Sequence, residues 1–149
     1  MNDLLITFRE KGKKKGFIFN EKQIKEENVR VNIELQNFIK NNLEAQKLIN
    51  LLKENNIKLK KQKEVLMNTV SSEDKNKINS TIQVIIEENS QHQNRVKKIL
   101  EENSSNFISE IDDNTNLSNQ ERRISKNVHG ATDKYFQNVM LKFQSLNPN

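Results

Sequence analysis

The chain has 149 residues, with 25 Lys and Arg against 20 Asp and Glu, 33% hydrophobic residues, no Cys, three Gly and one Pro. So few turn-forming residues exclude sandwiches, barrels and alternating α/β sheets, which need a turn about every dozen residues. Without Cys there is no disulfide framework and no thiolate metal site. Length and composition therefore predict one domain built from long helices.

Residues 1–20 are predicted to form a flexible basic leader. Positions 9–15 hold five basic residues against one acid, which accounts for most of the net charge of +5. Next to the apolar residues 17–19, this pattern is typical of segments that rest on an acidic membrane surface, with a solvated tail as the simpler interpretation. The possible lipid contacts are Arg9, Lys11, Lys13, Lys14 and Lys15. Beyond the leader no basic stripe is interleaved with aromatics, so we expect no nucleic-acid binding.

The first predicted helix covers about residues 28–70. Its apolar residues recur every three or four positions, which is the spacing of one helix face, and nine of its twelve stripe positions are apolar. The stripe consists of Val31, Leu35, Phe38, Asn42, Ala45, Ile49, Leu52, Asn56, Leu59, Lys63, Leu66 and Val70. Further apolar residues at positions 39, 43, 48 and 51 widen the stripe beyond a two-stranded seam, which favours a bundle.

The second predicted helix covers about residues 72–111. It begins at Ser71-Ser72-Glu73-Asp74, a hydroxyl cap followed by acids in the first turn, where the helix dipole favours negative charge. Its stripe consists of Ile78, Ile82, Ile85, Asn89, His92, Val96, Ile99 or Leu100, Asn103, Phe107 and Ile111. Because the break before it is short, we expect the first two helices to lie antiparallel.

A polar linker at residues 112–117 precedes the third predicted helix, 119–146. Ser118 and Glu121 have the spacing of a capping box, and Pro148 ends the helix. Its stripe consists of Ile124, Val128, Ala131, Tyr135, Phe136, Val139, Met140, Phe143 and Leu146. Gly130 lies inside the helix, where it costs about 1 kcal/mol relative to Ala, and a close helix contact is one reason to keep it.

Together these elements predict an all-α fold, an antiparallel up-down-up three-helix bundle with a left-handed twist, formed by residues 21–149. The third helix is shorter than its neighbours and leaves apolar surface uncovered, so we expect self-association or further sequence after Asn149. Four core positions are asparagines: Asn42, Asn56, Asn89 and Asn103. They either fix the register of the helices or reflect the abundance of Asn in the chain, and both interpretations stay open.

Neither the histidines nor any catalytic motif in the sequence indicates an enzyme. His92 and His129 are the two histidines, and neither has a metal-ligand partner three or four residues away. The sequence also contains no P-loop, no Gly-rich phosphate turn and no nucleophile elbow. We therefore expect no catalytic site, no metal and no cofactor. His92 falls on the apolar stripe and is interpreted as a satisfied core or partly buried histidine, with a pH switch as the alternative.

The third predicted helix contains the run Arg123-Ile124-Ser125-Lys126-Asn127-Val128-His129-Gly130-Ala131-Thr132-Asp133-Lys134-Tyr135-Phe136-Gln137-Asn138-Val139-Met140. This run resembles the third helix of the N-terminal Habc domain of syntaxins. The family pattern is approximately R-I-x-K-x-x-H-x-x-L-x-x-x-F-x-x-V-M. The matching residues are Arg123, Ile124, Lys126, His129, Phe136, Val139 and Met140. Thr132 departs from the pattern where the family often has Leu. The earlier helices are similar in a less specific way, so the resemblance covers about residues 30–147.

The resemblance implies a regulatory domain that precedes a SNARE motif and a C-terminal membrane anchor, in a protein of vesicle-mediated transport and membrane fusion. In such proteins the groove between the second and third helices receives the protein's own SNARE helix, and SM-family (Sec/Munc) proteins bind the domain. The implied partner-binding residues of the third helix are Arg123, Lys126, His129, Phe136 and Met140. Asp3 and Phe8 have the separation of the N-terminal peptide that SM-family proteins bind, although Leu4 and Leu5 depart from its pattern.

Under this interpretation the chain is a soluble fragment of a Qa-type SNARE, and the full-length protein acts at the cytoplasmic face of a membrane. The fragment lacks both the SNARE heptads and the run of about 20 apolar residues that an anchor requires. The alternative is a structural coiled-coil or spectrin-like spacer that works through its length and self-association. A third reading, an adaptor that binds lipid through the leader, is compatible with either.

Overall fold

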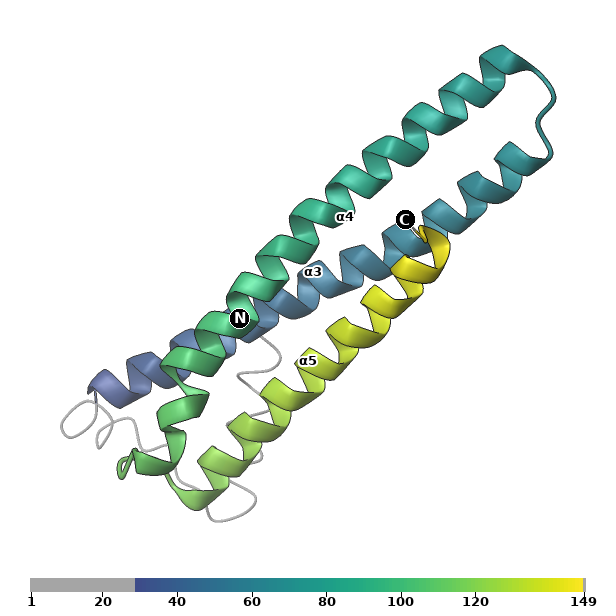
Figure 1. The fold of residues 1–149 in the computed structure, drawn as a ribbon. Helices are drawn as coiled ribbons and strands as arrows, with labels where there is room; N and C mark the ends of the chain where they lie inside the picture. Colours follow the sequence, from purple (N-terminus) through teal and green to yellow (C-terminus); the bar gives the residue numbers. More distant parts are fainter. Residues whose placement is uncertain (1–28, 149) are drawn as a thin grey trace. The chain divides into compact units, whose positions relative to one another are not determined.

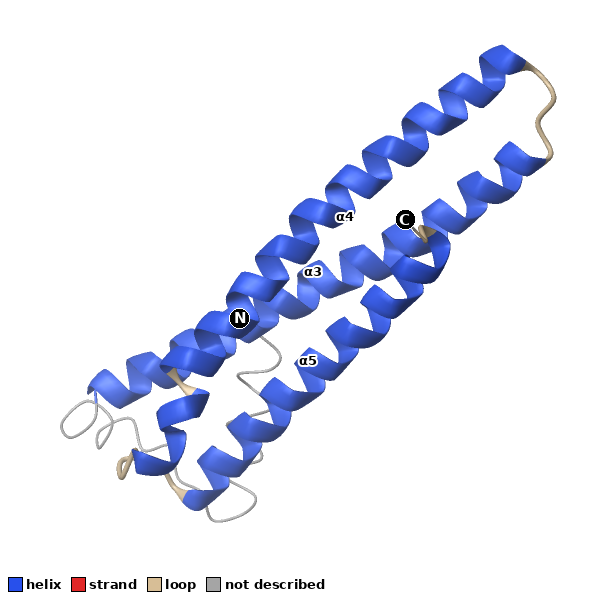
Figure 2. Ribbon diagram, in the orientation of Figure 1, coloured by secondary structure: helices blue, strands red, loops and turns tan. Residues whose placement is uncertain are grey.

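The computed structural model describes residues 29–148, which form three α-helices and one 3₁₀-helix without any β-strand (Figures 1 and 2). The helices are α3 (Val29–Met67), α4 (Ser72–Asn106), the 3₁₀-helix η1 (Ile108–Asp113) and α5 (Asn119–Leu146). The predicted all-α three-helix bundle is confirmed. The handedness of its twist stays a prediction.

The described chain divides into two compact units, and each unit contains a segment of every α-helix. Unit 1 comprises residues 29–46 and 98–133 of the described chain, and unit 2 comprises residues 47–97 and 134–148. Each unit is therefore a short three-helix bundle with its own core.

The hydrogen bonds between helices give their directions. Bonds between α3 and α4 join residues that are 62 apart in the sequence at Asn41 and 34 apart at Asn55, so the two helices run antiparallel. Bonds between α3 and α5 within unit 2 join residues 85, 83 and 83 apart at Asn50, Asn56 and Lys63. Because this separation stays nearly constant, α5 runs parallel to α3, and the order is up-down-up.

Helix α4 begins where the sequence predicts. The Ser71 hydroxyl accepts a hydrogen bond from the Asp74 amide at 3.4 Å, which makes Ser71 the N-cap. Glu73 and Asp74 then occupy the first turn. On the other side of the turn, α3 ends at Met67, three residues before the predicted boundary at residue 70, and Val70 is 92% exposed.

The end of α4 differs from the prediction. The α-helix stops at Asn106 instead of residue 111, and the chain tightens into η1. Phe107 and Ile111 are nevertheless buried. The Phe107 amide still donates to the Asn103 carbonyl at 3.1 Å, which keeps its side chain on the core face, and η1 brings Ile111 into the core. The segment predicted as a polar linker also contributes to this core, since Leu117 is buried in it.

The capping box of α5 is confirmed. The Glu121 amide donates to the Ser118 hydroxyl at 3.0 Å, and the Ser118 amide donates to the Glu121 carboxylate at 2.9 Å. Burial raises the pKa of Glu121, and the hydrogen bonds from Ser118 and the nearby Arg122 oppose that effect. Two backbone donors that α5 would otherwise leave unpaired are therefore satisfied.

The core of unit 1 forms around two stacked rings. The Phe38 and Phe107 ring centroids lie 4.7 Å apart with an interplanar angle of 22°, which joins α3 to the end of α4. Six buried residues make up this cluster: Leu35, Phe38, Ile39, Phe107, Ile111 and Leu117. Partly buried Ile124 packs against it from α5.

The α5 segment of unit 1 presents polar residues to the core. Ser125 and Thr132 are buried, whereas Ala131, which the sequence places on the stripe, is exposed. The Thr132 hydroxyl accepts a hydrogen bond from the Gln46 side chain at 3.4 Å. The stripe prediction at Ala131 was wrong because a hydroxyl with a partner on α3 takes the buried position.

Gly130 does not mark a close helix contact. A Cβ atom built at this position would have no heavy atom of a neighbouring element within 4 Å, and the residue is exposed. The suggested packing reason for this glycine is therefore wrong.

Buried asparagines connect all three helices of unit 2. The Asn55 amide group donates to the Asn89 oxygen at 2.9 Å, and Asn89 donates to the Asn56 oxygen at 3.4 Å. Asn56 in turn donates to the Val139 carbonyl of α5 at 3.1 Å. Such a chain of bonds holds only when the three helices are in register, which favours a register role for these residues.

Asn42 differs from the asparagines of unit 2. Its side chain is fully buried in unit 1, yet neither amide atom has a hydrogen-bond partner among residues 29–148. Burial without a partner is costly, so Asn42 is explained better by the Asn-rich composition than by register.

Candidate functional site

Arg123 and Lys126 of the predicted partner surface lie on the exposed side of α5 in unit 1. The Lys126 ammonium bonds both Asp112 carboxylate oxygens, at 2.7 and 2.8 Å. Both side chains of this ion pair are well exposed, so it contributes at most about 1 kcal/mol to stability. A carboxylate of a partner could therefore replace Asp112 as the ion-pair partner of Lys126 at little cost in free energy.

His129 is half-buried, and its ring lies 6.4 Å from the ring of Phe38 in α3. The Nδ1 atom is buried without a hydrogen-bond partner among the described residues. Burial lowers the pKa of His129, and the negative charge of Asp133 partly opposes this shift. The imidazole is therefore neutral at physiological pH and is oriented by packing more than by a partner.

Phe136 and Met140 lie in unit 2, where they are 6% and 9% exposed. Side chains so deeply covered contribute mainly to the core, and little of their surface is open to a partner. The five predicted residues are thus distributed over an exposed face of unit 1, the margin of its core, and the core of unit 2. The structure assigns them no common surface.

The candidate residues of the leader are Asp3, Phe8, Arg9, Lys11, Lys13, Lys14 and Lys15, and all lie outside the described residues. Their proposed contacts with an SM-family protein and with lipid stay predictions.

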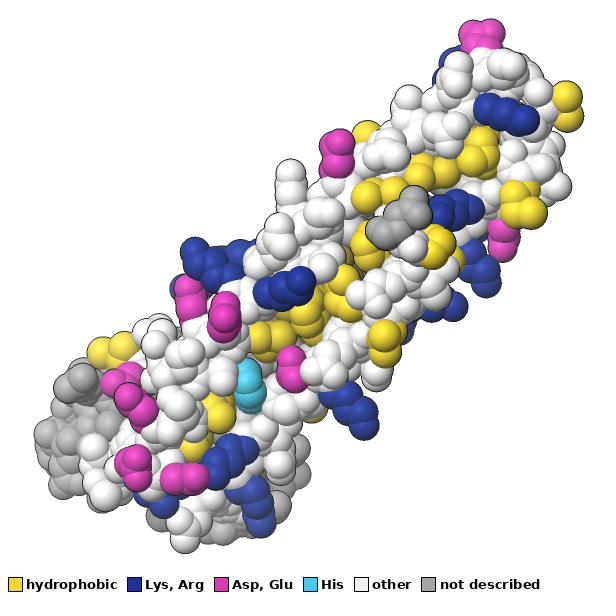
Figure 3. All heavy atoms as spheres, viewed as in Figure 1, with side chains coloured by type: hydrophobic (Ala, Val, Ile, Leu, Met, Phe, Trp, Pro, Cys, Tyr) yellow, Lys and Arg dark blue, Asp and Glu magenta, His cyan; other side chains and the backbone are white. Residues whose placement is uncertain are grey.

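Hydrophobic side chains of unit 2 show in the seam between α4 and α5 (Figure 3). Ile85 on α4 and Met140 and Phe143 on α5 retain 7–9% exposure. The resemblance puts a docked helix at this seam, but side chains covered to this degree leave little apolar surface for it.

A second apolar surface of unit 2 lies between α3 and α5. There a groove of about 480 Å³ opens to solvent. Its apolar lining comes from Ile57, Val139 and the ring of Tyr135. The Tyr135 hydroxyl donates to the Asn50 side chain at 2.8 Å, which fixes the ring against α3. The volume falls in the range of about 300–1,000 Å³ that is typical of ligand pockets.

Three lysines surround this groove: Lys53 and Lys60 on α3 and Lys142 on α5. All three are exposed, and none forms an ion pair with any residue of the described chain. Unit 2 as a whole carries twelve Lys and Arg against six Asp and Glu, a net charge of +6. Most of the excess positive charge is expected in the leader from the sequence alone. Unit 2 carries a positive excess as well.

Sequence reasoning missed the groove because its residues lie beside the main stripe of each helix. Lys53, Ile57 and Lys60 recur at spacings of four and three, which places them on one face of α3. That pattern was visible, but nothing in the sequence paired it with residues 135–142.

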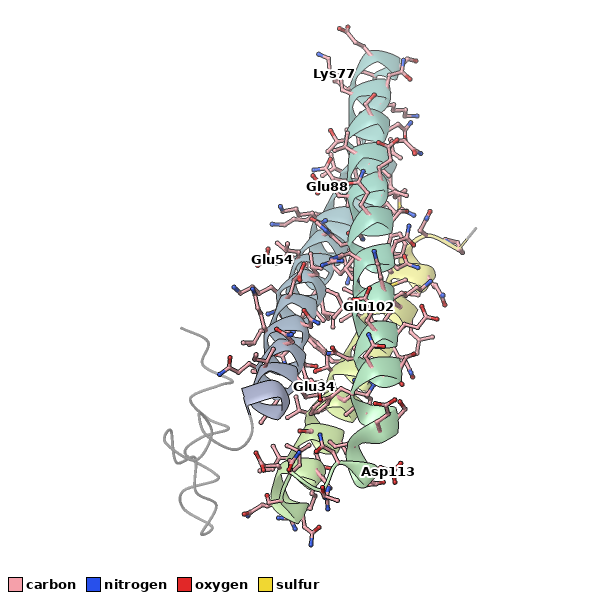
Figure 4. The ribbon with its side chains drawn as sticks, turned by 90° about the vertical axis from the view of Figure 1, so that its left-hand side faces the viewer. Glu34, Glu54, Lys77, Glu88, Glu102 and Asp113 are labelled. Atoms are coloured by element: carbon pink, nitrogen blue, oxygen red, sulfur yellow. The ribbon has the colours of Figure 1, made fainter. Side chains whose placement is uncertain are left out.

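The cavities of unit 1 have the opposite character. One, of about 190 Å³, lies between Glu34 and Glu102, which project from α3 and α4 (Figure 4). Another, of about 330 Å³, is lined by Glu34, Glu110 and Asp113. Within residues 29–148 no group of three His, Asp or Glu side chains is arranged to hold a metal ion. The described helices also include none that is long and apolar enough to span a membrane.

Comparison of the chain with protein-family models, curated proteins and solved structures gave no match.

Proposed function

We propose that the chain is the regulatory N-terminal domain of a syntaxin-like SNARE that acts in vesicle trafficking and membrane fusion. In this role it is a binding module, not an enzyme, and it binds its own SNARE helix, an SM-family protein, or both. The full-length protein would be held at the cytoplasmic face of a membrane by a C-terminal segment.

The observation that carries the proposal is the up-down-up arrangement in which α5 bears the syntaxin-like residues and adjoins α4. Hydrophobic side chains that show between these helices add to it, because an amphipathic helix binds by laying its apolar face along such a seam (Figure 3). Ile85, Met140 and Phe143 keep only 7–9% exposure there, so the contact they offer is narrow. The exposed Arg123 and Lys126 add positive charge on α5.

The proposed mechanism is competition between two partners for the SNARE helix. A helix docked on the domain is withheld from the fusion complex. To move the closed state from 1:99 to 99:1, the contacts must favour it by about 5.5 kcal/mol. Burial of apolar surface contributes about 25 cal/mol per Å², so about 220 Å² supplies this amount before the entropic cost of ordering the docked helix is subtracted.

The test is isothermal titration calorimetry of the domain with the SNARE helix from the same protein and, separately, with the matching SM-family protein. Binding of either supports the proposal, and binding of neither contradicts it. Arg123→Glu should weaken binding, with Lys40→Glu as a control because Lys40 is also an exposed cation of unit 1, on a different helix. Phe136→Ala is a poor probe, since Phe136 is buried and its loss acts first on folding.

A self-associating spacer is the second candidate, and exposed apolar side chains favour it. Val84 and Leu141 of unit 2 are 56% and 64% exposed. Sedimentation at several concentrations separates the two: a spacer forms a concentration-dependent dimer, whereas the regulatory domain stays monomeric without its partner.

A further inference from the structure

We propose that the lysine-rimmed groove between α3 and α5 of unit 2 is a second docking site, which receives an acidic amphipathic helix of another protein. The groove involves α3, whereas the proposed function concerns α4 and α5, so each can fail without the other.

The shape of the groove argues for a helix. The groove is lined by positions 53, 56, 57 and 60 of α3 and positions 135, 138, 139 and 142 of α5, so it follows two parallel helices. A helix laid along them places one ridge of side chains between the two rows. Ile57, which is 60% exposed, and the fixed ring of Tyr135 provide apolar contacts for that ridge.

The charges on the rim argue for acidic flanks. Lys53 and Lys60 are seven residues apart, which separates them by about 10.5 Å along α3. A docked helix with acids seven residues apart on one side meets both ammonium groups, and an acid on its other side meets Lys142 on α5. Because these lysines have no ion-pair partner within residues 29–148, binding breaks no existing ion pair.

Charge and burial decide against two other occupants. The leader of this chain carries five basic residues against one acid at positions 9–15, so the lysines of the rim repel it. A second copy of the chain has its own apolar stripes buried: Leu52, Leu59 and Val96 are at most 1% exposed. Its exposed apolar side chains, such as Val84 and Leu141, stand singly on their helices and form no ridge with a spacing of three and four within residues 29–148.

The probe is a designed peptide of about 20 residues, with Leu at a spacing of three and four and Glu seven residues apart on both sides of that ridge. A second peptide carries Lys in place of every Glu. Fluorescence anisotropy measures the affinity of each peptide for the full chain at low and at high salt. We expect the Glu peptide to bind at least about tenfold more tightly than the Lys peptide, with a difference that shrinks at high salt.

The double variant Lys53→Glu and Lys60→Glu should weaken the Glu peptide by about tenfold and strengthen the Lys peptide. The control is Lys58→Glu with Lys61→Glu, which changes the net charge equally at exposed positions of α3 outside the groove. Ile57→Ala should also weaken binding, with Leu141→Ala as its exposed apolar control. Circular dichroism confirms that each variant is folded.

Equal affinity for the two peptides would overturn the proposal. So would equal loss in the groove variant and its control, because net charge alone would then explain binding. Vesicles with acidic headgroups provide the last comparison. One result would show that the surface binds a membrane, and the proposal would then fail. In that result the groove variant loses vesicle binding and its control does not, while the Glu peptide binds the wild type and both variants with the same affinity.

Discussion

Replacing Asn42 with Leu should stabilise the protein, although Asn42 lies in the centre of a core stripe. Asn42 is fully buried, and both amide atoms lack a hydrogen-bond partner among residues 29–148. A buried polar group without a partner costs about 1–3 kcal/mol, and Leu has the same branching and number of side-chain heavy atoms. We therefore expect the free energy of unfolding to rise by about 1–3 kcal/mol.

The matched comparison is Asn56→Leu, at a site that is also buried. This change removes the bond to the Val139 carbonyl at 3.1 Å and leaves the Asn89 amide without its acceptor at 3.4 Å. We expect a loss of about 1–3 kcal/mol. Urea denaturation followed by far-UV circular dichroism measures both variants. If Asn42→Leu destabilises the protein as much as Asn56→Leu, the assignment of Asn42 as an uncompensated polar group is refuted.

Further predictions concern the third helix and the core of unit 1. Gly130→Ala should raise the free energy of unfolding by about 1 kcal/mol, because the new methyl group meets nothing in the described structure; a loss in urea denaturation would reveal a hidden contact. Ser118→Ala should cost about 1 kcal/mol by breaking the capping box, whereas Ser104→Ala, at an exposed site within α4, should change stability little. Phe107→Ala should cost about 3–5 kcal/mol, since its stacked ring is lost from a packed cluster; a cost below 1 kcal/mol would show that the cluster is not a core. Because burial lowers the pKa of His129, the unfolded state binds a proton more readily and stability should fall as the pH drops below about 6.5; His129→Gln should remove that part of the pH dependence.

The three helices were predictable because their apolar residues repeat over many turns. Leu35, Ile49 and Leu59 lie on the predicted stripe and are buried. The cap at Ser118 was predictable for a different reason, since a capping box is local chemistry that needs no tertiary partner.

The remaining features depend on partners distant in the sequence. Thr132 is buried in preference to Ala131 because Gln46, 86 residues earlier, supplies its hydrogen bond. The groove likewise needs α3 and α5 together, and no pattern within either helix shows that pairing. The partner surface predicted on α5 was chosen by resemblance, which does not reveal that Phe136 and Met140 face a core.

The parallel pairing of α3 with α5 has a consequence for the order of folding. Because only the turn at residues 68–71 separates α3 from α4, contacts between these helices can form first near the turn and then farther from it. The contact between Asn55 and Asn89 closes a loop of only 34 residues. The hydrogen bonds that join α3 to α5 at Gln46, Asn50, Asn56 and Lys63 span 83–86 residues, so each requires closure of a long loop at greater entropic cost. We therefore expect the hairpin of α3 and α4 to form first and α5 to join it last. During synthesis the apolar faces of that hairpin stay exposed until α5 packs against them. The nascent chain is most prone to aggregate in this interval.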